Sequence, residues 1–471
     1  MLLVICLAEL LERYGNYLIS ALLPLFLNEH EGLAPAVALR LAGYYLALGF
    51  AGGVIGGFVA DRFLGYRLAT RLGTVLFGLG AALLTWARPG MLYPALALLV
   101  LGSSCFKPAL SAWLGSLYAA GDVRQSAGFA WLYFAANIGA VVAPFIGGAL
   151  RTRYSWPLAF ATTTLAFGLC LVVVLVGQIG APAPRNQRPP APAPVGGSDK
   201  YPHEGSDGHS DGHSDGHSDG HSDGGSDGHS EGHSGGGSDG RPDGHSDGGS
   251  DGRLDVAPGR TRWRTLLVLL LLLILFALAY GQSGGAMLFF ARDRVDRRLL
   301  GWVIPPDFFA SVPAALVLIL TALQQAMWRA LARRRGVPRA GTAMMIGMFS
   351  SSVAFALLAA VAATHGEGTP RPLIGALWIV AALTLLTVGE VLVIPVGMAL
   401  VAQSAPPHKG ALAQGLLSAA LAIGLALAGE AGRFIAPWGA ARFFAAVAVL
   451  PLLGALLLIA GGAPRPTAEA S

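Results

Sequence analysis

Twelve apolar stretches, each long enough to cross a lipid bilayer as a helix, constrain the fold of this chain more than any other feature. A membrane-spanning helix needs about 20 mostly apolar residues, and it satisfies its own backbone hydrogen bonds. Only 13% of the 471 residues are charged, well below the share of about 25% in soluble domains. We therefore predict an all-α membrane protein with twelve transmembrane helices in two six-helix bundles. The stretches are residues 1–27, 36–60, 68–88, 92–117, 125–150, 157–180, 264–291, 309–332, 341–363, 372–403, 410–436 and 441–462.

A polar segment over residues 181–262 separates the sixth stretch from the seventh. It opens rich in proline and continues with Ser-Asp-Gly-His repeats, so it has almost no apolar side chain to bury. We expect a disordered linker, which joins an N-terminal bundle over 1–180 to a C-terminal bundle over 263–462. Residues 463–471 form a short tail.

Eight of the eleven histidines lie in this linker: His203, His209, His213, His217, His221, His229, His233 and His245. Imidazoles interleaved with carboxylates bind divalent metal. We interpret the segment as a flexible spacer with weak divalent metal binding, and a dedicated metal-sensing role is the alternative. The other three histidines, His30, His365 and His408, lie near the ends of the apolar stretches.

Arginines in short loops predict the orientation of the chain in the membrane. Arg62, Arg67 and Arg71 follow the second stretch, and five arginines follow the eighth over 329–339. Loops rich in Lys and Arg face the cytoplasm, so we expect both termini and the linker on the cytoplasmic side of the cell inner (plasma) membrane. Four arginines over 292–298 conflict with this assignment, because their loop would face the periplasm. We do not expect the first stretch to be a signal peptide, because no Lys or Arg precedes it and because it contains Glu9, Glu12 and Arg13.

Other functional classes are disfavoured. The net charge of +5 fits basic cytoplasmic loops, whereas nucleic-acid binding needs basic residues clustered on a soluble face. The membrane part shows no nucleophile beside a base and no cluster of metal ligands. We therefore expect no catalytic residue, no cofactor and no bound metal there, and the protein is not an enzyme. Cys6, Cys105 and Cys170 are interpreted as membrane-buried side chains.

Ionisable residues within membrane helices are costly and therefore mark functional positions. The first stretch holds a stripe of six polar side chains at helical spacing: Glu9, Glu12, Arg13, Asn16, Tyr17 and Ser20. A purely structural ion pair needs one acid and one base, so the second acid favours a role in proton or substrate binding. We expect this stripe to face a water-filled cavity.

Two further charges lie in the middle of opposite halves. Lys107 precedes Pro108 in the fourth stretch, and Glu390 precedes Pro395 in the tenth. Carriers built from two bundles bind their load near the midplane between them. Lys107 and Glu390 are therefore placed to bind the two ends of a zwitterion, and a structural salt bridge between bundles is the alternative.

Five motifs in order resemble the proton-dependent oligopeptide transporter family of the major facilitator superfamily. Glu9-Leu-Leu-Glu12-Arg13 looks like its ExxER signature, and Phe106-Lys107-Pro108 matches its fourth-helix lysine. The other three are the loop motif from Gly56 through Gly57, Asp61, Arg62 and Gly65 to Arg67, the fifth-helix run from Phe129 to Gly139, and Gly389-Glu390 with Pro395 and Gly397. The resemblance spans both halves and implies the major facilitator fold.

The resemblance also implies roles for particular residues. It assigns proton coupling to Glu9, Glu12, Arg13, Lys107 and Glu390. It assigns the substrate carboxylate to Arg13 and Lys107, and the amino end to Asn137 and Glu390. Tyr17, Asn16 and Gln282 complete the expected binding site. A conformational motif comprises Gly57, Asp61, Arg62, Gly65 and Arg67.

Four positions depart from the family pattern. Asn16 stands at a tyrosine position, and Val312 replaces an eighth-helix asparagine. Ser20 and Gly281 stand where many members have an arginine and a glutamate that pair in a periplasmic gate. Because both charges are absent, no orphan charge remains, and the gate cannot close through that salt bridge.

We expect a proton-coupled symporter that imports di- and tripeptides by alternating access and functions as a monomer. The first alternative keeps the fold and changes the load to nitrate, a drug-like molecule or a modified amino acid. A metal transporter is a second alternative, but it needs metal ligands at membrane depth. A membrane scaffold or sensor is a third, but it leaves the buried charges unexplained.

Overall fold

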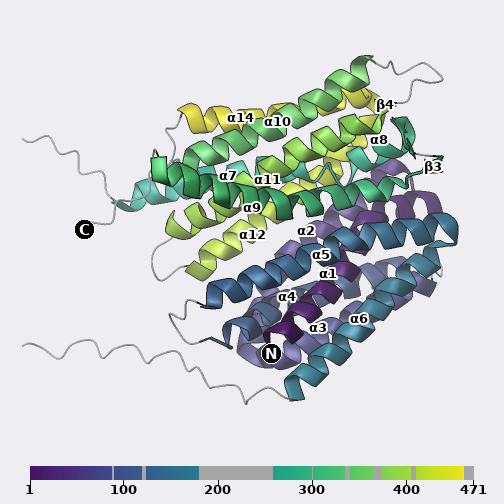
Figure 1. Ribbon diagram of the computed structural model, residues 1–471, viewed down its shortest axis with the longest axis vertical. Coiled ribbons are helices and arrows are strands. Elements are labelled where there is room, and N and C mark those ends of the chain that lie inside the picture. The colour runs from purple at the N-terminus through teal and green to yellow at the C-terminus, as the bar shows by residue number, and fades with distance from the viewer. Residues whose placement is uncertain are drawn as a thin grey trace, which may run out of the picture. The chain divides into compact units, whose positions relative to one another are not determined.

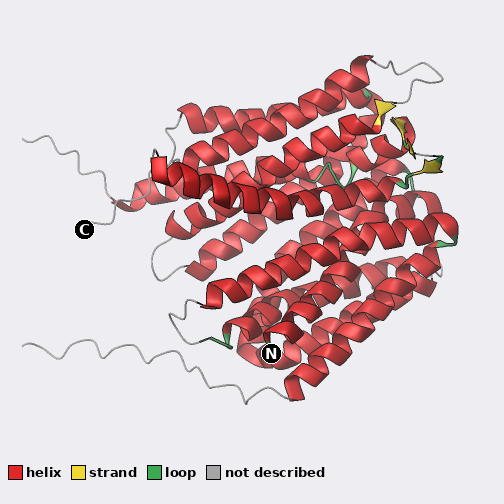
Figure 2. Cartoon of the chain, viewed as in Figure 1, coloured by secondary structure: helices red, strands yellow, loops and turns green. Residues whose placement is uncertain are grey.

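The computed structural model describes residues 1–86, 90–118, 124–179, 258–299, 301–334, 340–364, 374–404 and 410–460. Almost all of these residues are helical (Figure 2). The expected linker lies outside the described residues except for 258–262, which begin a helix earlier than predicted. The expected tail over 463–471 also lies outside them.

Twelve of the described helices contain 21 residues or more, six in each half of the chain (Figure 1). The first six are α1 (Leu2–Leu25), α2 (Pro35–Val59), α3 (Gly65–Trp86), α4 (Leu92–Gly115), α5 (Arg124–Arg153) and α6 (Trp156–Ile179). The second six are α7 (Pro258–Tyr280), α9 (Ser311–Arg334), α10 (Ala340–Thr364), α11 (Ala376–Ser404), α12 (Gly410–Ala431) and α14 (Ala440–Ala460). The predicted fold of twelve helices in two bundles is confirmed.

By length and apolar composition, nine segments of the described residues qualify as membrane spans. One of them, Pro35–Trp86, contains both α2 and α3. α1 is not among them because three ionisable residues lie near its middle, and the apolar part of α7, Arg264–Tyr280, is shorter. Polar residues thus interrupt the apolar pattern in the helix for which function is expected.

Short elements connect the long helices. They are η1 (Phe26–His30), η2 (Ala60–Leu64), α8 (Ala286–Arg294), η3 (Pro306–Ala310), η4 (Gly432–Phe434) and α13 (Ile435–Trp438). β1 (Val295–Asp296) pairs in parallel with β4 (Ile374–Gly375), and β2 (Arg298–Leu299) pairs antiparallel with β3 (Trp302–Val303). Figure 2 shows these strands gathered at one end of the helices.

The seventh predicted stretch, 264–291, is not one continuous helix. α7 ends at Tyr280, a turn covers 281–285, and α8 begins at Ala286. Glycine is costly in a helix interior, and three of the five turn residues are glycines. Gly285 has φ −115° and ψ −99°, well away from helical values. The single span predicted here is therefore wrong at its C-terminal end.

Helix packing builds each half and joins the two. α1 packs on α5 and α6, and α3 packs on α4 and α6, around a core that includes the stacked rings of Phe77 and Phe167. In the second half α10 packs on α11 and α14. Two pairs of helices join the halves, α2 with α12 and α5 with α9 (Figure 1). Side chains that lie between these two pairs of helices therefore come from both halves of the chain.

Two glycines of α2 that lie four residues apart, Gly52 and Gly56, bring this helix close to α4. A Cβ atom added at Gly56 would lie 1.9 Å from the backbone oxygen of Ser104, and one at Gly52 would lie 2.0 Å from its Oγ. Nothing lies within 4 Å of such an atom at Gly53. α2 therefore approaches α4 closely at Gly52 and Gly56 and not at Gly53.

Candidate functional site

A cavity of about 550 Å³ lies between the two halves of the chain. Residues of α1, α2 and α4 line one wall, and residues of α7, α11 and α12 line the other. Ligand pockets for small molecules typically enclose roughly 300–1,000 Å³. The charged residues of the lining are Arg13 and Lys107 on the first wall and Glu390 on the second. The cavity thus separates positive and negative groups in the way that a zwitterion requires.

The first acid of α1 is used in an ion pair. Arg13 Nη2 lies 2.9 Å from Glu9 Oε1, one helical turn away. Arg13 reaches the cavity, whereas Glu9 is 7% exposed and packs beside it. The charge of Glu9 is therefore compensated locally.

The second acid of α1 has different surroundings. Glu12 is 0% exposed, and its Oε1 accepts a hydrogen bond of 3.1 Å from Asn16 Nδ2. Its Oε2 has no hydrogen-bond partner among the described residues. Lys107 and Arg13 lie within electrostatic range of the carboxyl group. Glu12 therefore keeps a buried oxygen that can still accept a hydrogen bond.

The acid of the second half is surrounded by tyrosines. Glu390 lies on α11 and interacts electrostatically with Tyr17, Tyr133 and Tyr280. One of its oxygens, Oε2, is buried without a hydrogen-bond partner among the described residues. Unpaired buried carboxylate oxygens are costly, so this group is ready to accept donors from a ligand.

Five of the seven residues expected to bind substrate line this cavity: Arg13, Asn16, Tyr17, Lys107 and Glu390. The other two are not among its lining residues. The Asn137 amide donates to the backbone oxygen of Tyr133 at 2.9 Å. Gln282 is 1% exposed and donates to the backbone oxygen of Ala428 at 3.0 Å, so its amide binds α12 instead. Both amides satisfy backbone carbonyls next to the site.

The expected conformational motif lies where α2 passes through η2 into α3. Gly65 has φ +68°, a backbone conformation that glycine adopts at little cost. Gly57 lies beside Pro108 of α4, and Arg62 is exposed. The backbone oxygen of Arg67 accepts a hydrogen bond from Gln178, and the side chain of Asp61 lies outside the described residues.

Sequence reasoning missed two parts of the cavity. Tyr45 of α2 lines it, and its hydroxyl donates to Asn16. An apolar section of the wall comes from the region of α8, η3 and α11: Met287, Leu288, Phe309, Ile379 and Leu383. A buried tyrosine hydroxyl usually finds a partner, which is the one clue that the sequence offered for Tyr45.

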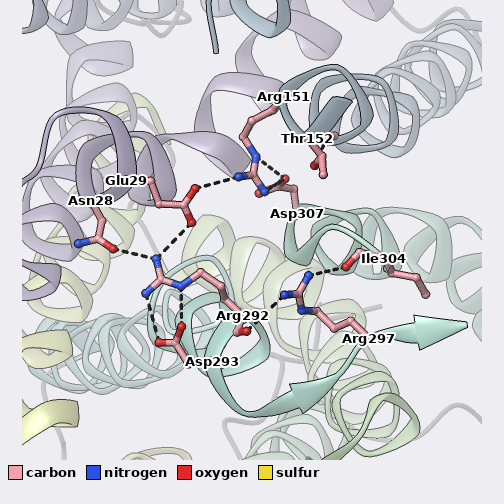
Figure 3. Close-up of polar contacts among 10 residues, drawn as sticks. Asn28, Glu29, Arg151, Thr152, Arg292, Asp293, Arg297, Ile304 and Asp307 are labelled. Atoms are coloured by element: carbon pink, nitrogen blue, oxygen red, sulfur yellow. Dashed lines mark hydrogen bonds and ion pairs between the residues drawn. The ribbon is translucent and has the colours of Figure 1, made fainter. Parts of the chain in front are cut away.

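A second group of charges joins the two halves at the end where α1 finishes (Figure 3). Arg151 of α5 pairs with Asp307 of η3 at 2.9 Å and with Glu29 of η1 at 2.9 Å. Arg292 of α8 contacts Glu29 at 3.3 Å and Asn28 at 2.8 Å. These contacts link residues of both halves in one continuous network.

Arg292 and Arg297, two arginines of the basic segment 292–298, lie in the same region as these ion pairs (Figure 3). Arg292 Nε lies 2.7 Å from the carboxylate of Asp293, and Arg297 donates to the backbone oxygen of Ile304 at 2.6 Å. Burial lowers the pKa of Arg297 from its usual value, with Arg151 as a further cause. These arginines therefore have specific structural partners.

A third contact between the halves lies on α2 and α12. The Tyr44 hydroxyl donates to the carboxylate of Glu430, and Arg40 Nε lies 3.9 Å from the same group. Nearby, a Cβ atom added at Gly43 would lie 2.6 Å from the Cα of Gly429. The two helices therefore touch through their backbones.

The fold and the cavity between its halves define a membrane carrier. The family model of the Major Facilitator Superfamily matches residues 5–366 of the sequence. The chain belongs to the Major Facilitator Superfamily. Its resemblance to the proton-dependent oligopeptide transporters, inferred from the motifs, is confirmed by the relatives described next.

Two curated relatives are peptide transporters by name. The peptide transporter YePEPT of Yersinia enterocolitica subsp. palearctica is 26% identical over 443 residues, which cover 90% of this chain and 86% of that protein. The dipeptide and tripeptide permease A of Escherichia coli is 24% identical over 409 residues, covering 84% of this chain and 77% of that one.

Solved structures share the fold. A crystal structure of the peptide transporter POT in complex with sulfate has a TM-score of 0.77 at 22% identity, covering 98% of this chain and 93% of that one. A POT family transporter in complex with 5-aminolevulinic acid has a TM-score of 0.75 at 19% identity, covering 98% and 95%.

Proposed function

We propose that this chain is a proton-coupled symporter that imports di- and tripeptides by alternating access. The observation that carries the proposal is the cavity of about 550 Å³ with Arg13 and Lys107 on one wall and Glu390 on the other. A short peptide carries a carboxylate at one end and an ammonium group at the other. The names of the curated relatives support the same substrate class.

Binding uses both halves at once. The carboxylate of the peptide pairs with Arg13 and Lys107, and its ammonium group pairs with Glu390, which interacts with Tyr280 on the opposite wall. Charged hydrogen bonds are stronger than neutral ones, so they fix the ends of the peptide. Because the charges lie on different halves, a bound peptide draws the two walls together.

Proton coupling resides on α1. The guanidinium of Arg13 pairs with Glu9, and in the loaded carrier it also binds the substrate carboxylate. A proton on Glu9 or Glu12 removes one negative charge from this cluster and frees Arg13 and Lys107 for the substrate. Glu12 interacts electrostatically with Glu9, Arg13 and Lys107, so a change in one charge affects the other three.

Alternating access needs contacts between the two halves that form at one end of the carrier while its other end opens. With both termini and the linker in the cytoplasm, the end where α1 finishes faces the periplasm. The ion pairs of Arg151 and Arg292 then hold the halves together on the periplasmic side. They supply a closing contact that Ser20 and Gly281 cannot make. The carrier works as a monomer in the inner membrane, and its linker binds divalent metal only weakly.

The test is uptake of labelled dialanine and trialanine into proteoliposomes that contain the purified protein, with and without an inward proton gradient. We expect accumulation that depends on the gradient and is lost in Lys107→Ala and Glu390→Gln. Arg153→Gln is the matched control, because Arg153 is exposed and lies away from the cavity lining. A folded protein that accumulates neither peptide would refute the proposal.

A further inference from the structure

A chain of hydrogen bonds connects α2 to the second acid of α1. The hydroxyl of Tyr45 donates to Asn16 Oδ1 at 3.0 Å, and Asn16 Nδ2 donates to Glu12 Oε1 at 3.1 Å. Ser20 Oγ donates to the backbone oxygen of Asn16 at 2.8 Å. The side-chain amide of Asn16 therefore uses its acceptor and its donor at the same time.

This amide lies between the cavity and the acid. Asn16 and Tyr45 line the cavity, whereas Glu12 is 0% exposed and is not part of the lining. Charged and titratable groups around Glu12 come from four helices: Glu9 and Arg13 of α1, Tyr45 of α2, Lys107 of α4 and Cys170 of α6. Asn16 both donates a hydrogen bond to Glu12 and lines the cavity.

An amide suits an acid that changes its charge. A carboxylate only accepts hydrogen bonds, so the charged form of Glu12 requires the NH₂ group of Asn16. A protonated carboxyl group also donates, and it is matched by the amide oxygen if the amide turns over. The Tyr45 hydroxyl accommodates both orientations because it donates and accepts. Neither α1 nor α2 has to move.

We propose that Asn16 is a positioning residue for proton coupling, which orients the carboxyl group of Glu12 and satisfies its hydrogen bonds in both charge states. Tyr45 holds the amide in place from α2. The proton comes from water in the cavity, adds to a carboxylate oxygen of Glu12, and returns to water when the opposite side opens. This inference rests on the proposed symport, and it concerns a position at which the chain departs from the family tyrosine.

The experiment compares Asn16→Leu, Asn16→Asp and Tyr45→Phe in proteoliposomes that contain purified protein. Two readouts are measured: gradient-driven accumulation of labelled dialanine as a function of pH, and counterflow of the same peptide at equal pH on both sides. Tyr14→Phe is the matched control, because Tyr14 lies on α1 like Asn16 but is not part of the cavity lining. Its hydroxyl donates to Thr162 of α6 at 2.9 Å, so the substitution removes a comparable hydrogen bond elsewhere.

Asn16→Leu should move the pH midpoint of driven uptake upward by about one unit, whatever its effect on the rate of counterflow. The reason is that the charged carboxylate loses its donor and binds a proton more readily. Asn16→Asp should shift the midpoint further in the same direction, because a second acid of the same size replaces the donor. Tyr45→Phe should give a smaller shift, and Tyr14→Phe none.

A wild-type pH midpoint in Asn16→Asp and Tyr45→Phe would overturn the inference even if the leucine variant fails to fold. Loss of counterflow in folded Asn16→Leu with an unchanged pH midpoint of driven uptake would overturn it as well, because it would place Asn16 in substrate binding alone. Absence of gradient-dependent uptake in the wild type would instead refute the proposed symport.

Discussion

Arg151 of α5 and Asp307 of η3 are 156 positions apart, yet Arg151 Nη2 lies 2.9 Å from Asp307 Oδ2 and joins the two halves. Asp307 is 0% exposed, and the Arg151 side chain is 11% exposed. Glu29 shares the same guanidinium at 2.9 Å. An ion pair this deeply buried is costly to break, because the remaining charge loses its compensation.

Asp307→Asn should destabilise the conformation in which these contacts are formed. Breaking a buried ion pair costs about 3–5 kcal/mol, and the remaining contact with Glu29 places the expected loss near the lower end. The measurement uses a protein in which Cys6, Cys105 and Cys170 are replaced and Ala310 is changed to cysteine. This cysteine should react faster with an impermeant maleimide when Asp307→Asn is present than when Asp307 is retained. Arg153→Gln serves as the control, and equal labelling rates in both variants would contradict the prediction.

Gly43→Ala should prevent the close contact between α2 and α12. Its Cβ would meet the Cα of Gly429 at 2.6 Å, and a backbone atom cannot move aside as a flexible side chain can. We expect uptake to fall by about tenfold or more, with the protein still folded, because overpacking of this kind typically costs about 1–3 kcal/mol. Gly168→Ala is the control, since nothing lies within 4 Å of the added atom; if both variants transport equally, this contact is dispensable.

Glu390 should recognise the amino end of the peptide. Wild-type protein should bind N-acetyl-dialanine about tenfold or more weakly than dialanine, because the acetylated peptide leaves the buried carboxylate without a charged partner. Glu390→Gln should bind dialanine weakly and lose most of this discrimination. Competition with labelled dialanine measures both ratios. An unchanged discrimination ratio in Glu390→Gln would place the amino end elsewhere.

Glu12→Gln should separate transport from its driving force. Glutamine matches the size of the acid and keeps an acceptor for Asn16, but it cannot gain or lose a proton. We expect accumulation driven by the proton gradient to disappear while counterflow persists. The two assays run on one preparation of proteoliposomes, and wild-type accumulation in this variant would remove Glu12 from the coupling mechanism.

Much of the binding site was predictable because each charge within an apolar stretch is costly. That cost predicts a functional role for Arg13, Lys107 and Glu390, and all three line the cavity. The family resemblance predicts substrate contacts for Asn137 and Gln282, but their amides bind backbone carbonyls outside that lining. An uncharged amide side chain lacks the cost that marks a charged residue as functional, so the sequence does not reveal its role. The direction in which the amide points depends on the local backbone.

The apolar stretches alone determined that this chain spans a membrane as twelve helices, because helices satisfy every backbone hydrogen bond within a lipid bilayer. They also determined which helix carries the acids. Only the tertiary structure decided that Tyr45 reaches Asn16 and that Arg151 meets Asp307. The physical reason is that these contacts join helices distant in sequence, and helical periodicity sets which face a residue occupies without setting which helix lies against that face.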